Sequence, residues 1–142
     1  MRRALTLLAL LALVTVVVWA ARGVCRAQCL LELRPSRYGG RGVFATRPVR
    51  KGAVIEKCPY LKVKPDTHGI RDYVFEHSDG KHHMLVLGYG GMYNHSPRPN
   101  ATYEEDGDTM VYYATRDIPA DAEITVSYGG AWWDTRTKSM IT

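Results

Sequence analysis

Two stretches of this chain combine side chains that could bind a ligand or take part in catalysis. Residues 94–100 read "NHSPRPN" and place amide, imidazole and hydroxyl groups in a loop stiffened by two prolines. Residues 123–128 read "EITVSY", which alternates polar and apolar positions and ends in Tyr128 before two glycines. Taken singly, they are an ordinary loop with local hydrogen bonds and an ordinary core strand. Whether they share a chemical role depends on their order and spacing, together with a third stretch.

The third stretch is rich in glycine. Residues 38–42 read "YGGRG", in which Gly40 and Gly42 flank Arg41. The stretch lacks the trailing lysine of a phosphate-binding loop and is not the full glycine motif that opens a helix in dinucleotide-binding proteins. A plain turn is its simplest interpretation, but glycines also let the main chain approach a ligand closely.

Neither the histidines nor the cysteines indicate a metal centre. His77, His82 and His83 surround a predicted turn with no cysteine nearby, so we expect the solvent-exposed end of a hairpin there. The three cysteines include no CxxC pair and are too few for a disulfide framework. The sequence shows no local signature of a serine or cysteine hydrolase either. We therefore predict no metal ligand, and the chemistry must come from the three stretches above.

The elements that would position these residues are predominantly strands. From Leu30 onward, short runs rich in valine, isoleucine, tyrosine and threonine alternate with glycine and proline signals, with little helical periodicity. Lys51-Gly52, residues 78–80 and residues 104–108 supply turns, and the last of them closes a hairpin. We predict a mostly β domain. Its expected strands are residues 30–34, 42–47, 53–57, 60–64, 71–76, 84–88, 100–104, 109–115 and 123–128.

Length and charge limit the classes of protein that remain. The 142 residues, 46% hydrophobic and 23% charged, suit one folded domain with an appendage. We place that domain at residues 30–135, with residues 136–142 as a tail. Four arginines lie in the first 26 positions, which contain no acidic residue, and the rest of the chain has 15 basic and 14 acidic residues. This balance gives no reason to expect direct binding to nucleic acid.

Residues 1–29 form a separate N-terminal segment. It contains an uncharged, mostly apolar run at residues 4–21, close to the roughly 20 residues needed to cross a bilayer. We expect a hydrophobic helix that anchors the protein in a membrane by a single pass, and the flanking arginines slightly favour a cytoplasmic domain. The alternatives are a signal peptide cleaved after Ala20 and an organelle-import peptide.

The three stretches together resemble the signature regions of SET-domain protein-lysine methyltransferases. These enzymes carry G-x-G near the start, N-H-S-x-x-P-N in the middle and E-[IL]-T-x-x-Y near the end, and all three occur here in that order over residues 31–133. The phrases "DYVF" and "LGYG" are most similar to the compact SET proteins of bacteria and large algal viruses, which lack cysteine-rich flanks. The resemblance implies several small β-sheets, with the C-terminal segment threaded beneath a preceding loop as a pseudoknot.

The resemblance also implies transfer of a methyl group from S-adenosylmethionine to a lysine amine of a protein, with histone as the family's best-known substrate. Cofactor and peptide would enter from opposite faces and meet in a narrow channel. Tyr128 matches the catalytic tyrosine, whose neutral phenol can orient the methyl donor. No side-chain base is evident, so the lysine proton would leave by a water path. The residues implied to bind the cofactor are Gly40, Arg41 at the variable middle position, Gly42, Asn94 and His95.

An aromatic channel would hold the lysine stem and the methylated ammonium by packing and by cation–π attraction. Each candidate aromatic residue could instead belong to the core. Trp132 stands where compact relatives often have a tyrosine, and we expect one of the adjacent Trp132 and Trp133 to pack over the site. A homodimer could close the site further. The alternative function is a noncatalytic, membrane-tethered SET module that acts in protein interaction. The channel candidates are Tyr73, Tyr89, Tyr93 and Trp132.

Overall fold

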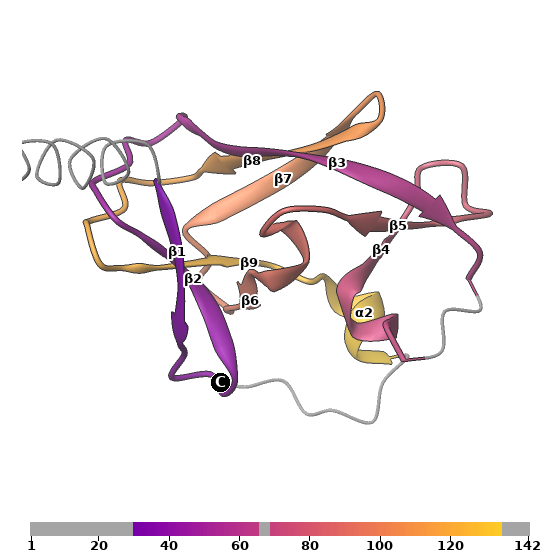
Figure 1. The fold of residues 1–142 in the computed structure, drawn as a ribbon, viewed down its shortest axis with the longest axis horizontal. Coiled ribbons are helices and arrows are strands. Elements are labelled where there is room, and N and C mark those ends of the chain that lie inside the picture. Colours follow the sequence, from indigo (N-terminus) through magenta and orange to yellow (C-terminus); the bar gives the residue numbers. More distant parts are fainter. Residues whose placement is uncertain (1–29, 66–68, 135–142) are drawn as a thin grey trace, which may run out of the picture.

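A computed structural model describes residues 30–65 and 69–134, which form two β-sheets joined by loops and short helical turns (Figure 1). The first sheet has four strands in the order β1-β2-β9-β6. These strands are β1 (Leu31–Pro35), β2 (Arg41–Ala45), β9 (Glu123–Val126) and β6 (Asn94–His95). Because each of the three candidate stretches contributes a strand to this sheet, stretches that are far apart in the sequence become neighbours.

The second sheet has five strands in the order β4-β5-β3-β8-β7, and all its neighbouring pairs are antiparallel. Its strands are β4 (Val74–Glu76), β5 (His83–Val86), β3 (Val54–Val63), β8 (Thr109–Ala114) and β7 (Ala101–Asp106). The helical elements are the 3-10 turns η1 (Arg71–Tyr73) and η2 (Gly90–Met92) and the helix α2 (Gly130–Asp134). Figure 1 places α2 beside η1 and the start of β4.

The last strand of the described residues, β9, is an inner strand of the four-stranded sheet. β9 pairs antiparallel with β2, where Val43 faces Ile124, and parallel with β6, where His95 faces Val126. A late strand inserted between two earlier ones agrees with the threaded C-terminal segment that the resemblance implied. The parallel pair brings β6 alongside the strand that leads to Tyr128.

The strands of both sheets bury side chains in one core. Val43 of β2, Tyr112 of β8 and Ile124 of β9 have no exposed surface, and they belong to a single cluster that draws on both sheets. Burial of this kind stabilises a fold by about 25 cal/mol for each Å² of apolar surface removed from water. The strands that carry the candidate residues therefore rest on a close-packed base.

Most of the predicted strands are present, but three details differ. The expected strands 53–57 and 60–64 form one strand, β3. Pro59 does not interrupt it, because Pro59 lies where the partner of β3 changes from β8 to β5 and its missing N–H leaves no ladder hydrogen bond unmade. The prediction of a strand over residues 71–76 is wrong in its first half, which forms η1. β6 was not predicted, because a strand of two residues carries no periodic pattern.

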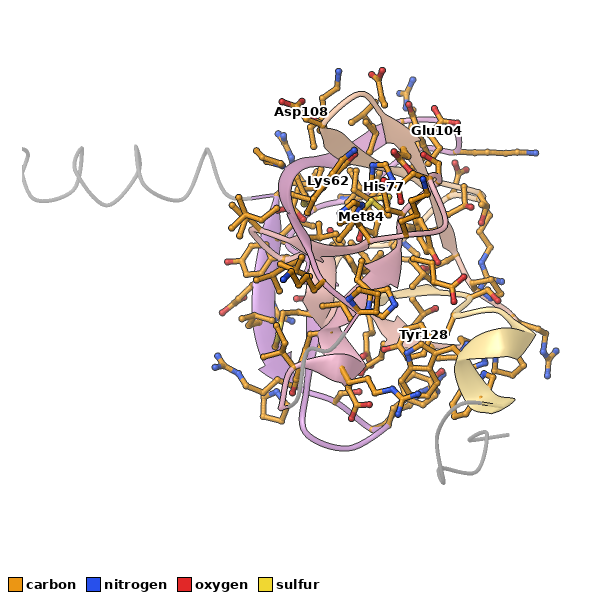
Figure 2. All side chains as sticks on the ribbon, turned by 90° about the vertical axis from the view of Figure 1, so that its right-hand side faces the viewer. Lys62, His77, Met84, Glu104, Asp108 and Tyr128 are labelled. Carbon is orange, nitrogen blue, oxygen red and sulfur yellow. The ribbon has the colours of Figure 1, made fainter. Side chains whose placement is uncertain are left out.

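The predicted hairpin turn at residues 104–108 is confirmed. β7 and β8 pair up to Asp106 and Thr109, and Gly107 turns the chain with a φ of 64°, which glycine adopts at little cost. Figure 2 shows Glu104 and Asp108 on this hairpin, well away from Tyr128, which lies beside α2. The hairpin is thus remote from the candidate catalytic residue.

The prediction of a solvent-exposed hairpin end is wrong for His77, which is 7% exposed. Its Nδ1 accepts a hydrogen bond from the N–H of Asp79 at 3.0 Å, and its Nε2 lies 3.2 Å from Glu105 Oε1. His77 therefore fastens the β4–β5 hairpin to β7. Among residues 30–65 and 69–134, no group of three or more histidine, cysteine or acidic side chains could hold a metal ion.

The predicted membrane anchor, residues 4–21, lies outside the described residues, and so does the tail at residues 136–142. Within residues 30–65 and 69–134, no helix has the length and apolar character needed to span a bilayer. The anchor therefore stays a prediction.

Candidate active site

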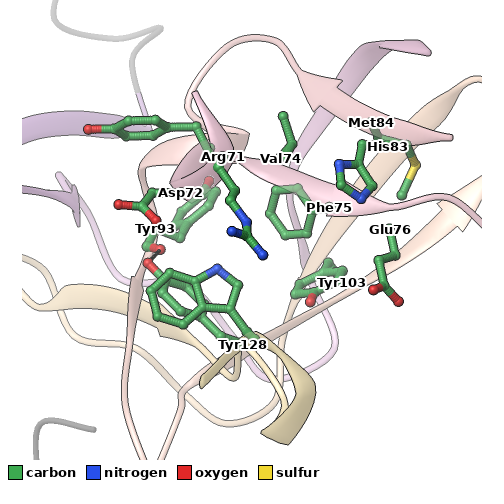
Figure 3. A pocket seen from close by; sticks show the side chains of 13 residues that line it. Arg71, Asp72, Val74, Phe75, Glu76, His83, Met84, Tyr93, Tyr103 and Tyr128 are labelled. Carbon is green, nitrogen blue, oxygen red and sulfur yellow. Dashed lines mark hydrogen bonds between the residues drawn. The ribbon is translucent and has the colours of Figure 1, made fainter. Parts of the chain in front are cut away.

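Two cavities meet where η1, η2 and α2 come together. The glycine cavity, of about 530 Å³, is lined by residues 38–41, Asn94 and His95 together with Trp133. The aromatic cavity, of about 320 Å³, is lined by residues 71–76, Tyr93 and Tyr103 (Figure 3). Five residues line both cavities and form the wall between them: Asp72, Tyr73, Gly91, Tyr128 and Trp132.

Tyr128 is fixed in this wall by two hydrogen bonds. Its hydroxyl donates to the main-chain carbonyl of Tyr93 at 2.9 Å, and its N–H donates to His95 Nδ1 at 3.2 Å. Burial, followed by the negative charge of Asp72, raises the pKa of Tyr128 to about 12. The side chain is therefore a neutral phenol at physiological pH, held in one orientation between the cavities.

His95 and Trp133 bring two buried N–H donors to the glycine cavity. Because His95 Nδ1 accepts a hydrogen bond, the ring proton of the neutral imidazole is on Nε2. His95 Nε2 and Trp133 Nε1 are both buried without a hydrogen-bond partner among the described residues. The rings lie 5.0 Å apart, edge to face. Buried donors are normally paired, so these two atoms suit a ligand that accepts hydrogen bonds.

The partly buried position of His95 predicts lower stability in mild acid. Burial lowers the pKa of folded His95, while an unfolded histidine takes up its proton near about pH 6.5. Proton uptake therefore favours the unfolded chain, and the stability contributed by His95, present above that pH, is lost as the pH falls.

Urea unfolding at about pH 7.5 and about pH 5.5 measures this effect as a drop in the free energy of unfolding. We expect a smaller drop for His95→Asn than for the native chain. His82→Asn is the control, because the His82 side chain is 44% exposed and lies beside Asp79. An equal drop in the native chain and His95→Asn would contradict the assignment.

A carboxylate fixes the amide of Asn94. Asn94 Nδ2 donates to Glu123 Oε1 at 2.8 Å and to the carbonyl of Arg41 at 3.1 Å. Glu123 also accepts the hydroxyl of Ser36 at 2.8 Å. With both N–H groups engaged, Asn94 Oδ1 is left to accept a hydrogen bond from a ligand in the glycine cavity. Glu123 stood out in the sequence only as part of a motif, and the structure gives it this positioning role.

The two motif glycines are needed for different physical reasons. Gly40 lines the glycine cavity and has a φ of 62°, which most side chains disfavour. Gly42 does not line the cavity, but a Cβ placed there would lie 2.8 Å from Glu123 Cδ and 2.9 Å from Asn94 Nδ2. Gly42 is thus needed to leave room for the side chain that orients Asn94. Arg41, between them, lines the cavity and is exposed.

Three of the four predicted channel residues line the aromatic cavity: Tyr73, Tyr93 and Trp132. The Trp132 and Tyr128 rings are 4.7 Å apart. The fourth, Tyr89, lines neither cavity and instead packs against the core. The structure therefore gives no support to Tyr89 as a channel residue.

Three charged residues that line the aromatic cavity were not predicted from the sequence: Arg71, Asp72 and Glu76. Asp72 lies in the shared wall, and Figure 3 shows it near Tyr93 and Tyr128. In the same view the side chain of Arg71 extends toward Phe75. Arg71 and Asp72 precede Tyr73 in the "DYVF" region. They line the cavity because η1 forms there in place of a regular strand. A ligand in the aromatic cavity would thus meet aromatic rings and both signs of charge.

Comparison with known proteins identifies the family. Residues 40–129, more than half of the chain, match the family described as SET domain. The chain therefore belongs to the SET-domain family. The predicted closeness to compact bacterial and viral members stays a prediction.

The relatives agree with this family. Over 112 residues the chain is 36% identical to "Histone-lysine N-methyltransferase, H3 lysine-37 specific" of Schizosaccharomyces pombe, covering 72% of this chain and 76% of that protein. Over 64 residues it is 45% identical to the SET domain-containing protein SmydA-8, isoform B, of Drosophila melanogaster, covering 42% of this chain but only 14% of that protein. The second likeness therefore concerns the domain alone.

A solved structure supports the fold. A crystal structure described as that of a Plasmodium falciparum "putative histone methyltransferase" has a TM-score of 0.66 and 34% sequence identity, covering 75% of this chain and 98% of that chain. The predicted mostly β SET fold is confirmed by this likeness.

Proposed function

We propose that this chain transfers methyl groups from S-adenosylmethionine to a lysine amine of a protein, with histone H3 as the first candidate substrate. The predicted enzyme class, a protein-lysine methyltransferase, is confirmed by the SET family match and by the 36% identical relative over most of the chain. The observation that carries the proposal is the pair of cavities that share a wall containing Tyr128. Two reactants could enter from separate sides and meet there.

The glycine cavity fits S-adenosylmethionine by the chemistry of its donors and acceptors. The heterocyclic nitrogens of an adenine can accept hydrogen bonds from the unpartnered N–H groups of His95 and Trp133. The α-ammonium of the amino-acid part suits Asn94 Oδ1, which is free to accept within the described residues. When bound, the cofactor would supply a methyl group on a cationic sulfur.

The aromatic cavity fits the substrate lysine. Tyr73, Tyr93 and Trp132 can pack along the aliphatic stem, and their π faces attract a cationic amine. Only the neutral amine has the lone pair that attacks a methyl carbon, and a free lysine has a pKa of about 10.4. Desolvation in the cavity favours loss of its proton to water. The neutral Tyr128 then holds the reacting groups in line.

Glu123 offers a test of the cofactor assignment. Glu123→Gln leaves a single acceptor oxygen in place of the carboxylate that accepts the Asn94 amide and the Ser36 hydroxyl, so the hydrogen bond that orients Asn94 should weaken. We expect the Kd for S-adenosylmethionine, measured by calorimetry, to rise about tenfold, the equivalent of one hydrogen bond. Glu104→Gln, on the exposed face of β7, is the matched control. Equal affinity in both variants would contradict this positioning role.

Histone H3 as a substrate is supported by the Schizosaccharomyces pombe relative, whose name specifies H3 lysine 37. The test incubates the full chain, in mild detergent, with methyl-labelled S-adenosylmethionine and either histone H3 or a cell extract. Mass spectrometry then locates labelled lysines. Labelling of H3 is the expected result, whereas labelling only of other proteins overturns the histone assignment. Cofactor binding without any labelled lysine would favour the noncatalytic SET module instead.

We also propose that residues 4–21 anchor the chain in a membrane, with the SET domain on the cytoplasmic side. The support is the uncharged run and its flanking arginines. Fractionation with protease protection tests this: a full-length chain recovered in the soluble fraction would count against the anchor.

A further inference from the structure

The wall between the two cavities includes part of a loop whose own hydrogen bonds are too few to fix its conformation. Residues 88–93 read "GYGGMY"; Gly91 lines both cavities, Met92 lines the glycine cavity and Tyr93 lines the aromatic cavity. Only Gly90–Met92 forms a helical turn. Ordering a glycine-rich loop costs more backbone entropy than ordering other residues. Its conformation must therefore be fixed by contacts from other elements.

Glu56 of β3 binds this loop toward both of its ends. Glu56 Oε1 accepts the N–H of Tyr89 at 3.1 Å, and Glu56 Oε2 accepts the hydroxyl of Tyr93 at 2.9 Å. The fit is close, since a Cβ at Gly88 would lie 2.7 Å from Glu56 Oε1. Between these two points, the hydroxyl of Tyr112 donates to the carbonyl of Gly90 at 2.9 Å. The loop is thus held at three points from β3 and β8.

Tyr93 connects Glu56 to the catalytic candidate. Tyr93 is 2% exposed, so its position is set by its neighbours. Its side-chain hydroxyl is bound by Glu56, and its main-chain carbonyl accepts the hydroxyl of Tyr128 at 2.9 Å. Any displacement of Tyr93 therefore moves the acceptor that orients the phenol of Tyr128.

The setting of Glu56 is unusual for a carboxylate. It lies in β3 between the buried Ile55 and Cys58, and it forms no ion pair within residues 30–65 and 69–134. Burial, followed by the charge of Glu56, raises the pKa of the Cys58 thiol to about 12 and also raises the pKa of Tyr93. Hydrogen bonds to an ionised group are stronger than hydrogen bonds between neutral groups. The hydrogen bonds from the loop are therefore the main interactions that stabilise the charge of the Glu56 carboxylate.

We propose that Glu56 is a positioning residue for methyl transfer, acting on Tyr128 through Tyr93. The inference rests on the proposed function. Glu56 lines neither cavity and so would contact neither cofactor nor lysine. Its carboxylate fixes the loop, and the carbonyl of that loop fixes the phenol.

Kinetics of full-chain variants test this role. Glu56→Ala should lower kcat about tenfold, the equivalent of one hydrogen bond in the transition state. Glu56→Gln should retain part of the activity, because its amide oxygen can still accept one hydrogen bond. Glu56→Ala and Tyr93→Phe should be less than additive when combined, since both remove the same contact. The Kd for S-adenosylmethionine should change by less than about twofold, because catalysis and binding respond separately.

A second tyrosine–glutamate pair provides matched controls. Tyr60 is buried, and its hydroxyl lies 2.7 Å from the carbonyl of Gly107 and 3.1 Å from Glu105 Oε1, outside both cavities. Tyr60→Phe and Glu105→Gln should lower Tm to a similar degree but leave kcat unchanged. If Glu56→Ala lowers kcat no more than Glu105→Gln does, the positioning role is wrong.

A readout without catalysis separates this inference from the proposed function. In chains labelled with ¹³C at tyrosine Cζ, the NMR signal of Tyr128 reports the hydrogen bonding of its hydroxyl. The signal should move in Glu56→Ala and Tyr93→Phe but not in Tyr60→Phe. An unmoved signal overturns the inference. A native chain that methylates nothing overturns the proposed function, and the NMR result still decides the role of Glu56.

Discussion

Replacing Tyr128 with phenylalanine should lower kcat for lysine methylation about 10²-fold, the loss expected when reacting groups are held about 1 Å out of place. The hydroxyl donates to the carbonyl of Tyr93 at 2.9 Å. Burial, with the charge of Asp72, raises the pKa of Tyr128 to about 12, so the donor is present across the physiological pH range. Phenylalanine preserves the ring that packs 4.7 Å from Trp132 but loses the group that fixes its orientation.

Initial rates at varied peptide and varied cofactor concentrations measure this effect, and calorimetry gives the cofactor Kd. We expect the loss in kcat, with KM and Kd changed by less than about threefold, because the hydroxyl acts mainly in the transition state. Tyr113→Phe is the matched control: its hydroxyl interacts with Glu104 on β7, and it lines neither cavity. If Tyr128→Phe were as active as Tyr113→Phe, Tyr128 would not be the catalytic tyrosine, although the enzyme class would stand.

The fold class could be predicted from the sequence because runs rich in β-branched and aromatic residues mark strands locally. "EITV" and "TMVYYA" became β9 and β8 for this reason, and Ile124 and Tyr112 are fully buried. Which strands pair is a separate question. The placement of β9 between β2 and β6 joins residues far apart in the chain, and threaded connections are too rare to predict from periodicity. Only the family resemblance implied it.

Part of the candidate site was equally accessible from sequence. Gly40, Asn94, His95 and Tyr128 stand in motifs, and the structure brings all four to the glycine cavity. Glu56 carries no such mark, since a glutamate in "VIEKC" is typical of an exposed strand position. Its contacts to Tyr89 and Tyr93 depend on the packing of β3 against the loop that precedes β6, which the sequence does not show.

Tyr89 is the opposite case, a residue that the sequence suggested for the channel but that lines neither cavity. It was chosen because it is an aromatic residue beside glycines, but its side chain packs against the core. Trp133 was harder to assign, because two adjacent tryptophans cannot be ranked by sequence. A short helix after β9 lets both of them line the glycine cavity. Residue type thus indicated the chemistry, while loop geometry decided which residue supplies it.

Gly42→Ala should have the largest effect on cofactor binding of any substitution outside the cavities. The added methyl group would overlap the carboxylate of Glu123 and lie 2.9 Å from Asn94 Nδ2. Displacing Glu123 breaks its hydrogen bonds to Asn94 and Ser36. Two such bonds at about 1.4 kcal/mol each correspond to a rise of about 100-fold in the Kd for S-adenosylmethionine. Overpacking should also lower the free energy of unfolding by about 1 to 3 kcal/mol.

Calorimetry with S-adenosylmethionine and urea unfolding measure the two effects of Gly42→Ala separately. Gly52→Ala is the control, since it adds the same methyl group at a turn where a Cβ would meet no atom within 4 Å. At Gly52 the φ of 79° makes alanine strained, so stability should fall while the Kd stays unchanged. In a Glu123→Ala background, Gly42→Ala should cost much less, because the main clashing side chain is gone. Native affinity in Gly42→Ala would mean that Glu123 and Asn94 do not form the cofactor-binding arrangement proposed here.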